Sequence, residues 1–182
     1  SYSNYGASLA SNLLRVRPSD RYAVLEAGIA GRGAMAGISR MLQPDIVVVT
    51  SIRSDHNRSF PTLLDTRAEK VKIVAGLPPG GTAFLNGDDP HVGWMATQTN
   101  ARVVTFGLGP GNGIQALNIR VDGDGTTFDV RADGDVYTVR SHLLGEHMIY
   151  PQLAAVAVLH HEGLDVRAAL PRLADVSAAT SR

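Results

Sequence analysis

The spacing of apolar residues changes near Gly113, and that change constrains the fold more than any other feature of the sequence. Before it, short continuous apolar runs alternate with segments of helical periodicity. After it, apolar and polar residues alternate in runs that Asp-Gly pairs interrupt. Continuous apolar runs are typical of strands covered by helices on both faces, whereas strict alternation is typical of antiparallel strands. The pattern therefore predicts an α/β fold with two kinds of strand pairing.

The part before Gly113 predicts a doubly wound, mostly parallel sheet. Apolar runs predict strands, and the segments between them predict helices, in the order expected for parallel strands joined by crossover helices. The expected strands are 22–28, 45–52, 81–87 and 101–108, and the expected helices are 35–42, 61–77 and 89–97.

The part after Gly113 predicts an antiparallel β meander followed by two helices. Period-two runs between residues 113 and 145 are separated by Asp-Gly turns, which are a strong local signal for hairpins. Helical periodicity returns over 147–161 and 165–175, with Asp165 as the expected N-cap of the last helix. No interdomain linker stands out, so we expect residues 1–182 to form a single domain.

Composition excludes several functional classes. The chain has no cysteine, which excludes disulfide scaffolds, cysteine zinc sites and cysteine nucleophiles, and which fits a reducing cytoplasm. The 17 basic and 17 acidic residues give no net charge, so we expect no binding to nucleic acid. No apolar run approaches the roughly 20 residues that span a bilayer, so we expect no membrane span. Nothing in the sequence indicates an oligomeric state.

Polar residues lie at the expected carboxyl ends of the strands, which is where parallel sheets bind ligands. Glu26 interrupts the first apolar run, and Asp55 and His56 follow the second. A carboxylate and an imidazole at one sheet edge suit a divalent cation. The alternative is that Glu26 is a solvated or ion-paired residue and that His56 is structural.

Five sequence elements occur in an order that is typical of one enzyme family. They are VLEAG, PDIVVVTSIRSDH, a helix that carries EK, GLPPGGTAFLNGDDP, and LLGEH followed by LAAVAVLHHEGLD. Together they resemble the central domain of the Mur ligases, especially of the D-alanyl-D-alanine-adding branch. Cyanophycin synthetase and folylpolyglutamate synthase are more distant relatives. The resemblance covers essentially the whole chain and implies the P-loop NTPase-like fold of that domain.

The resemblance implies catalytic and metal-binding roles for three residues. Glu26 corresponds to a carboxylate that helps to hold Mg²⁺ near the phosphates of ATP, and His56 corresponds to a ligand of a second Mg²⁺. Lys70 follows His56 by 70 − 56 = 14 residues, the separation expected in that branch, where the lysine is carbamylated and becomes an anionic oxygen ligand. Lys72 is a competing candidate, and both lysines are otherwise ordinary solvated helix residues. Catalysis is therefore assigned to Lys70 and His56, and metal binding to all three.

Two further residues are assigned to the nucleotide. Asn86 follows the third strand with Asp88 and Asp89 and is expected to line the same cleft, although Asp-Asp-Pro is also a typical helix N-cap. His147 corresponds to a residue beside the adenine base, and the alternative is a histidine that merely begins a helix.

The sequence departs from the family pattern at three places. It contains no G-x-x-x-x-G-K-[S/T], and its Gly-rich segment 107–113 precedes a strand, so we expect a plain loop there. The phosphate-binding loop and its strand are expected upstream of residue 1. Ser51 stands where the family has an asparagine, and Met148 and Pro151 replace two asparagines associated with the base. Base recognition therefore differs or is absent.

The activity that the resemblance implies is ATP-dependent formation of an amide bond in the cytoplasm. ATP and Mg²⁺ would activate a carboxylate as an acyl phosphate, which an amine would attack, on a peptide, nucleotide-sugar or other small-molecule substrate. We expect residues 1–182 alone to be inactive, because the phosphate-binding loop and the C-terminal ligase domain are missing. Two alternatives stay open: a non-catalytic Mur-fold module that acts as a scaffold or partner-binding domain, and an unrelated doubly wound domain.

Overall fold

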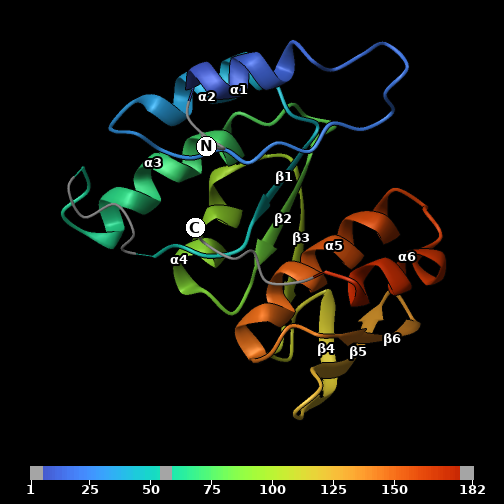
Figure 1. Ribbon diagram of the computed structural model, residues 1–182. Helices are drawn as coiled ribbons and strands as arrows, with labels where there is room; N and C mark the ends of the chain where they lie inside the picture. Colours follow the sequence, from blue (N-terminus) through green and yellow to red (C-terminus); the bar gives the residue numbers. More distant parts are fainter. Residues whose placement is uncertain (1–5, 54–58, 177–182) are drawn as a thin grey trace. The chain divides into compact units, whose positions relative to one another are not determined.

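The computed structural model describes residues 6–53 and 59–176, which form a mixed α/β structure (Figure 1). Its strands make one sheet in the order β1-β2-β3-β4-β5-β6. The strands are β1 Ile46–Val49, β2 Thr82–Asn86, β3 Arg102–Gly107, β4 Ile114–Val121, β5 Thr126–Ala132 and β6 Asp135–Ser141. The helices are α1 Gly6–Leu13, α2 Ala34–Leu42, α3 Leu63–Ala75, α4 Pro90–Gly93, α5 Ile149–His161 and α6 Val166–Ala174, with 3₁₀ turns η1 Trp94–Gln98 and η2 Glu146–Met148.

The first strands of the sheet run in the same direction, as the continuous apolar runs predict. The backbone N–H of Thr82 donates to the carbonyl of Asp45 at 2.9 Å, which joins the beginnings of β2 and β1. The N–H of Arg102 donates to the carbonyl of Gly81 at 3.1 Å, which joins the beginnings of β3 and β2. β3 and β4 are also parallel. The parallel arrangement is therefore confirmed for the strands expected over 45–52, 81–87 and 101–108.

The last three strands form the predicted antiparallel meander, because β4 pairs with β5 and β5 with β6 in opposite directions. The turn between β5 and β6 consists of Asp133 and Gly134, with φ of 46° and 92°. Two successive residues in the left-handed region are what a tight hairpin turn needs, and aspartate and glycine tolerate that region best. The Asp-Gly signal was therefore sufficient to place this turn.

The chain divides into two compact units, each with its own buried apolar residues. Unit 1 comprises Ser1–Val47, Ser51–Ala83 and Trp94–Arg102, and unit 2 comprises Val48–Thr50, Phe84–Gly93 and Val103–Arg182. In unit 1, Ile29 and Met35 belong to a core cluster that also contains Leu9, Ile38 and Phe60. In unit 2, the largest fully buried side chains include Phe84, Phe106, Phe128 and Leu153.

The expected first strand, 22–28, is wrong, because the structure assigns no strand over these residues. The segment is extended but only one side of it is covered: Leu25 and Ala27 pack against the core cluster of unit 1, whereas Val24 is 96% exposed. A strand is defined by ladder hydrogen bonds to a neighbour, and apolar character alone does not supply that neighbour. The sequence pattern also did not predict α1, which precedes this segment.

The remaining elements lie within a few residues of their predicted positions. The helix expected over 61–77 begins only at Leu63, because the side chain of Thr62 caps it by accepting from the N–H of Asp65. Asp165 caps α6 as predicted, accepting from the N–H of Ala168 at 3.1 Å.

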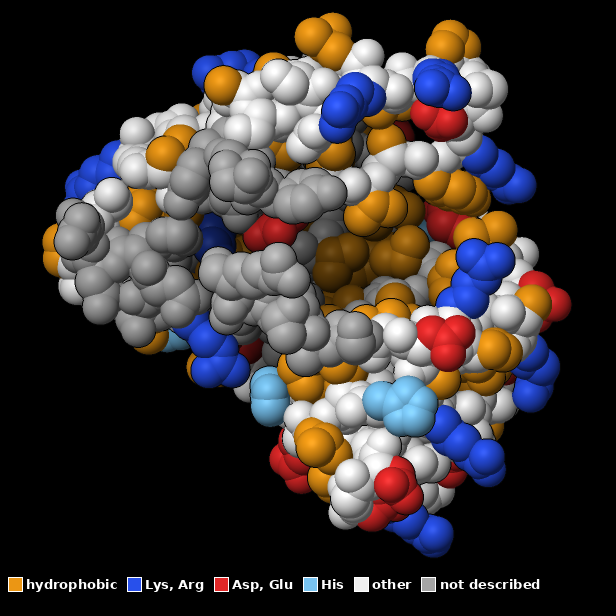
Figure 2. Space-filling view, viewed as in Figure 1, with side chains coloured by type: hydrophobic (Ala, Val, Ile, Leu, Met, Phe, Trp, Pro, Cys, Tyr) orange, Lys and Arg blue, Asp and Glu red, His pale blue; other side chains and the backbone are white. Residues whose placement is uncertain are grey.

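None of the helices in the described ranges is long and apolar enough to cross a membrane. On the described part of the face in Figure 2, basic and acidic side chains are interspersed.

Candidate functional site

Glu26 lies in the extended segment of unit 1 and is exposed. It falls between Leu25 and Ala27, which pack against the core, and its own side chain is on the uncovered side of the segment. The expectation that Glu26 ends a buried strand is therefore wrong, although its carboxylate is accessible to a hydrated cation. Carboxylate oxygen is a ligand that Mg²⁺ accepts.

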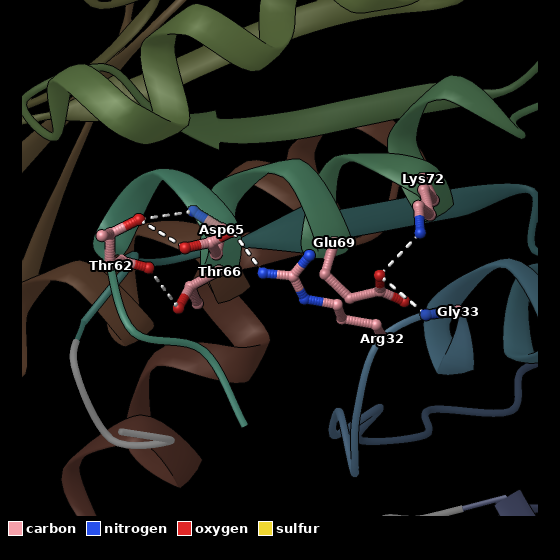
Figure 3. A network of polar contacts seen from close by, with 7 residues as sticks. All are labelled: Arg32, Gly33, Thr62, Asp65, Thr66, Glu69 and Lys72. Carbon is pink, nitrogen blue, oxygen red and sulfur yellow. Dashed lines mark hydrogen bonds and ion pairs between the residues drawn. The ribbon is translucent and has the colours of Figure 1, made fainter. Parts of the chain in front are cut away.

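Lys70 lies in α3, as predicted, and is half-buried. The helix is anchored at its start by a short network: Thr62 Oγ1 donates to Asp65 Oδ2 at 2.7 Å, and Asp65 Oδ1 accepts from Arg32 at 2.9 Å. The negative charge of Asp65 also stabilises the first turn of the helix, where the helix dipole favours an anion. These contacts (Figure 3) fix where α3 begins, and therefore where Lys70 lies along it.

Glu69, next to Lys70, is the most buried charged group of α3, with an exposed fraction of 3%. Its carboxylate accepts from the backbone N–H of Gly33 at 2.9 Å and from Lys72 Nζ at 2.6 Å (Figure 3). It also accepts from the backbone N–H of Met35 at 2.9 Å. Gly33 precedes α2 with φ of 85°, a left-handed conformation that glycine adopts without strain. Glu69 thus supplies the hydrogen-bond acceptor at the first turn of α2 that no side chain of α2 provides.

The pKa of Glu69 is lowered in this setting. Burial by itself raises it, but the hydrogen bonds from Lys72, Gly33 and Met35 and the charge of Lys72 together outweigh that effect. Glu69 is therefore anionic over the whole neutral range. Sequence reasoning missed this residue, since a glutamate among basic residues in a helix is typical of a solvated surface.

The ion pair also bears on which lysine is the candidate for carbamylation. Lys72 Nζ contacts the carboxylate of Glu69 at 2.6 Å, so the two side chains form an ion pair. A carbamate on Lys72 would replace this ion pair by two neighbouring anions, so Lys72 is the poorer of the two candidates. Lys70 stays the predicted site of the modification.

The other residues expected beside the cation lie outside the described residues. They are His56 and its neighbour Asp55. The predicted meeting of Glu26, His56 and Lys70 therefore stays a prediction. Within the described residues, no group of three histidine or acidic side chains is placed to hold a metal ion.

Asn86 ends β2 in unit 2 and is buried, with an exposed fraction of 5%. Its Nδ2 donates to the carbonyl of Thr50 at 2.8 Å, and its Oδ1 accepts from the N–H of Asp88 at 3.0 Å. Both ends of the amide are thus used inside the protein.

Asp89 caps α4 by accepting from the N–H groups of His91 and Val92, which confirms the N-cap alternative for this residue.

Asp88 joins three segments of unit 2. Its carboxylate accepts from the N–H groups of Leu108 and Gly109, at 2.5 and 3.1 Å, and from Asn112 Nδ2 at 2.9 Å. The hydroxyl of Tyr150, at the start of α5, donates to it at 3.1 Å. The Gly-rich segment 107–113 is a loop between β3 and β4, as expected, and its first amides are directed at a carboxylate of the protein itself.

His147 lies in η2 and is exposed. Pro151 sits in the first turn of α5, where a missing N–H removes no helix bond. The neighbouring Gln152 does not replace the lost asparagine amides: its Nε2 donates to the carbonyl of Met148 at 2.9 Å, and its Oε1 is buried without a partner. This segment therefore presents no side-chain amide to an adenine base.

Comparison with known proteins places the chain in a family. Residues 3–159 match the Mur ligase middle domain. The UDP-N-acetylmuramate–L-alanine ligase of Psychrobacter sp. (strain PRwf-1) is 33% identical over 140 residues, which are 74% of this chain and 29% of that protein. The UDP-N-acetylmuramoyl-tripeptide–D-alanyl-D-alanine ligase of Escherichia coli (strain K12) is 29% identical over 181 residues, which are 98% of this chain and 40% of that protein.

The fold agrees with solved structures of the same family. A crystal structure of MurF from Acinetobacter baumannii superposes with a TM-score of 0.85 at 23% identity, covering 93% of this chain and 37% of that one. The chain thus spans less than half the length of these relatives. The resemblance inferred from the five sequence elements is confirmed: this chain belongs to the Mur ligase family, in which it corresponds to the middle domain.

Proposed function

We propose that the chain is the ATP-binding middle domain of a ligase that joins a carboxylate to an amine through an acyl phosphate. The observation that carries this proposal is the match of residues 3–159 to the Mur ligase middle domain, together with relatives named as ligases of UDP-N-acetylmuramate with L-alanine and of UDP-N-acetylmuramoyl-tripeptide with D-alanyl-D-alanine. The substrate would be a peptide or nucleotide-sugar precursor of that kind, with ATP as the phosphoryl donor.

Three residues of this chain would bind Mg²⁺, and a fourth positions one of them. Glu26 and, as a carbamate, Lys70 would provide anionic oxygen ligands for Mg²⁺, and His56 would provide a further ligand. Bound Mg²⁺ would neutralise charge on the transferring phosphoryl group. Catalysis of this kind consists mostly of positioning and charge stabilisation, so the chain needs few acid–base side chains. Glu69 contributes by holding α3, and therefore Lys70, against the start of α2.

The direct test replaces Lys70 in the full-length protein. Lys70→Ala should abolish ligase activity, and a short-chain acid such as acetate should restore part of it, because it returns an oxygen anion to the space left by the carbamate. Lys72→Ala is the matched control, since it removes a lysine two residues away that is committed to Glu69. Full activity of Lys70→Ala, or equal losses in the two variants without rescue, would refute the carbamate assignment.

A second candidate is a non-catalytic Mur-fold module that has lost nucleotide recognition. The observation in its favour is the segment around α5, where Met148 and Pro151 replace amides and Gln152 is turned inward. Calorimetry of the full-length protein with Mg-ATP separates the two candidates. Micromolar binding supports the ligase, and no measurable heat at millimolar ATP supports the module.

A further inference from the structure

The side chain of Arg67, in α3, lies over the indole ring of Trp94 in η1. Its guanidinium carbon is 3.9 Å from the centre of the ring, and both residues are half-buried parts of unit 1. The negative face of an indole ring attracts a cation, and arginine uses this arrangement more often than lysine. The ring therefore holds the guanidinium in place without neutralising its charge.

This guanidinium has no counter-ion in the part of the chain that the structure describes. The carboxylates nearest to it along α3 are committed elsewhere: Asp65 pairs with Arg32 at 2.9 Å, and Glu69 pairs with Lys72 at 2.6 Å. The Nε atom of Arg67 is buried and has no hydrogen-bond acceptor. Buried polar groups of native proteins are nearly always paired, so an unpaired and charged donor requires an explanation.

We propose that Arg67 and Trp94 form a binding site for an oxyanion, which is a phosphate or carboxylate group of a ligand. A guanidinium presents its N–H groups as a rigid planar fork, and this fork matches two oxygens of a phosphate or a carboxylate. The indole restricts the side chain beforehand, so less conformational freedom is lost when the anion binds. The site lies within unit 1 and does not depend on the ligase activity.

The experiment uses the fact that Trp94 is the only tryptophan of the 182-residue chain, so its emission reports on this site alone. The chain is titrated with inorganic phosphate and separately with acetate, and with chloride at the same ionic strength as a control for screening. We expect a saturable change in emission with phosphate, with acetate or with both, and no saturable change with chloride. The anion that binds more tightly identifies the class of ligand.

Variants connect the response to the guanidinium. Arg67→Met should weaken anion binding at least about tenfold, because it removes the charge and the fork, and Arg67→Lys should weaken it severalfold, because it keeps the charge and loses the fork. Arg40→Met, at an exposed position of α2, should leave binding unchanged. If Arg67→Met does not fold, as judged by circular dichroism, the lysine variant decides.

Three results would overturn the proposal. One is the absence of any saturable change in Trp94 emission up to about 10 mM phosphate or acetate, because binding weaker than this would not be specific. Another is an equal response to chloride, which indicates screening only. The third is an unchanged affinity in Arg67→Met, or in Arg67→Lys if the methionine variant does not fold, which would show that the guanidinium of Arg67 does not bind the anion.

Discussion

Truncation of Glu69 is the perturbation whose effect the structure allows us to estimate most closely. Glu69→Ala removes the acceptor of two backbone N–H groups, those of Gly33 and Met35, in the buried contact between α3 and α2. A buried donor left without a partner costs about 1–3 kcal/mol. The third contact adds little, because the side chain of Lys72 is 40% exposed and exposed ion pairs contribute about 0–1 kcal/mol. The buried N–H of Met35 accounts for about 1–3 kcal/mol and the part-buried N–H of Gly33 for about 0.5–1.5 kcal/mol. Together with the ion pair, we expect a loss of about 2–5 kcal/mol in the free energy of unfolding.

Urea unfolding followed by Trp94 emission measures this loss, since Trp94 belongs to the same unit as Glu69. Lys72→Met is the matched control, because it removes the ion pair and leaves both backbone hydrogen bonds in place, and it should cost at most about 1 kcal/mol. The reasoning fails if Glu69→Ala destabilises unit 1 no more than Lys72→Met does. In that case the carboxylate would not be what holds the first turn of α2.

Three further predictions follow from individual contacts. The pKa of Glu69 is lowered on folding, so the stabilisation by its carboxylate is present above the ordinary value of 4.5 and is lost as the pH falls through the lower folded-state pKa. The difference in the free energy of unfolding between wild type and Glu69→Gln should therefore shrink when urea titrations are carried out in acid. Asp88→Ala should speed amide hydrogen exchange at Leu108 at least about tenfold, and Tyr150→Phe should speed it less, since it removes only one of the donors. Thr62→Ala should lower the stability of unit 1 by about 1 kcal/mol in urea, whereas Thr62→Ser should not.

These predictions share a physical basis, which is that several anchors of this domain are carboxylates that accept backbone N–H groups. Glu69 does so for α2, and Asp88 does so for the loop 107–113. Charge-assisted hydrogen bonds of this type are stronger than neutral ones and hold backbone segments that have no ladder partner. Unchanged hydrogen exchange at Leu108 in Asp88→Ala would contradict this view for the loop.

The candidate site was predicted from the sequence only in part. Lys70 lies on the predicted helix, and Asp89 is the helix cap that the Asp-Asp-Pro motif favoured. The surroundings of these residues were not predictable, because Glu69 and Asp88 find most of their hydrogen-bond partners in segments that are distant in the sequence. His56 lies outside the described residues, so its meeting with Glu26 and Lys70 stays a prediction.

The sequence by itself determined the order and type of most elements, from β1 through the antiparallel meander to α6. It did so because the period of apolar residues reflects which faces of a local segment are covered, and that is a property of a few consecutive residues. Tertiary structure alone decided that 22–28 is not a strand, and that Glu69 caps a helix from 34 or 36 residues away. A strand ladder and a buried hydrogen bond each need a second segment of the chain, and the local pattern of apolar residues does not identify that segment.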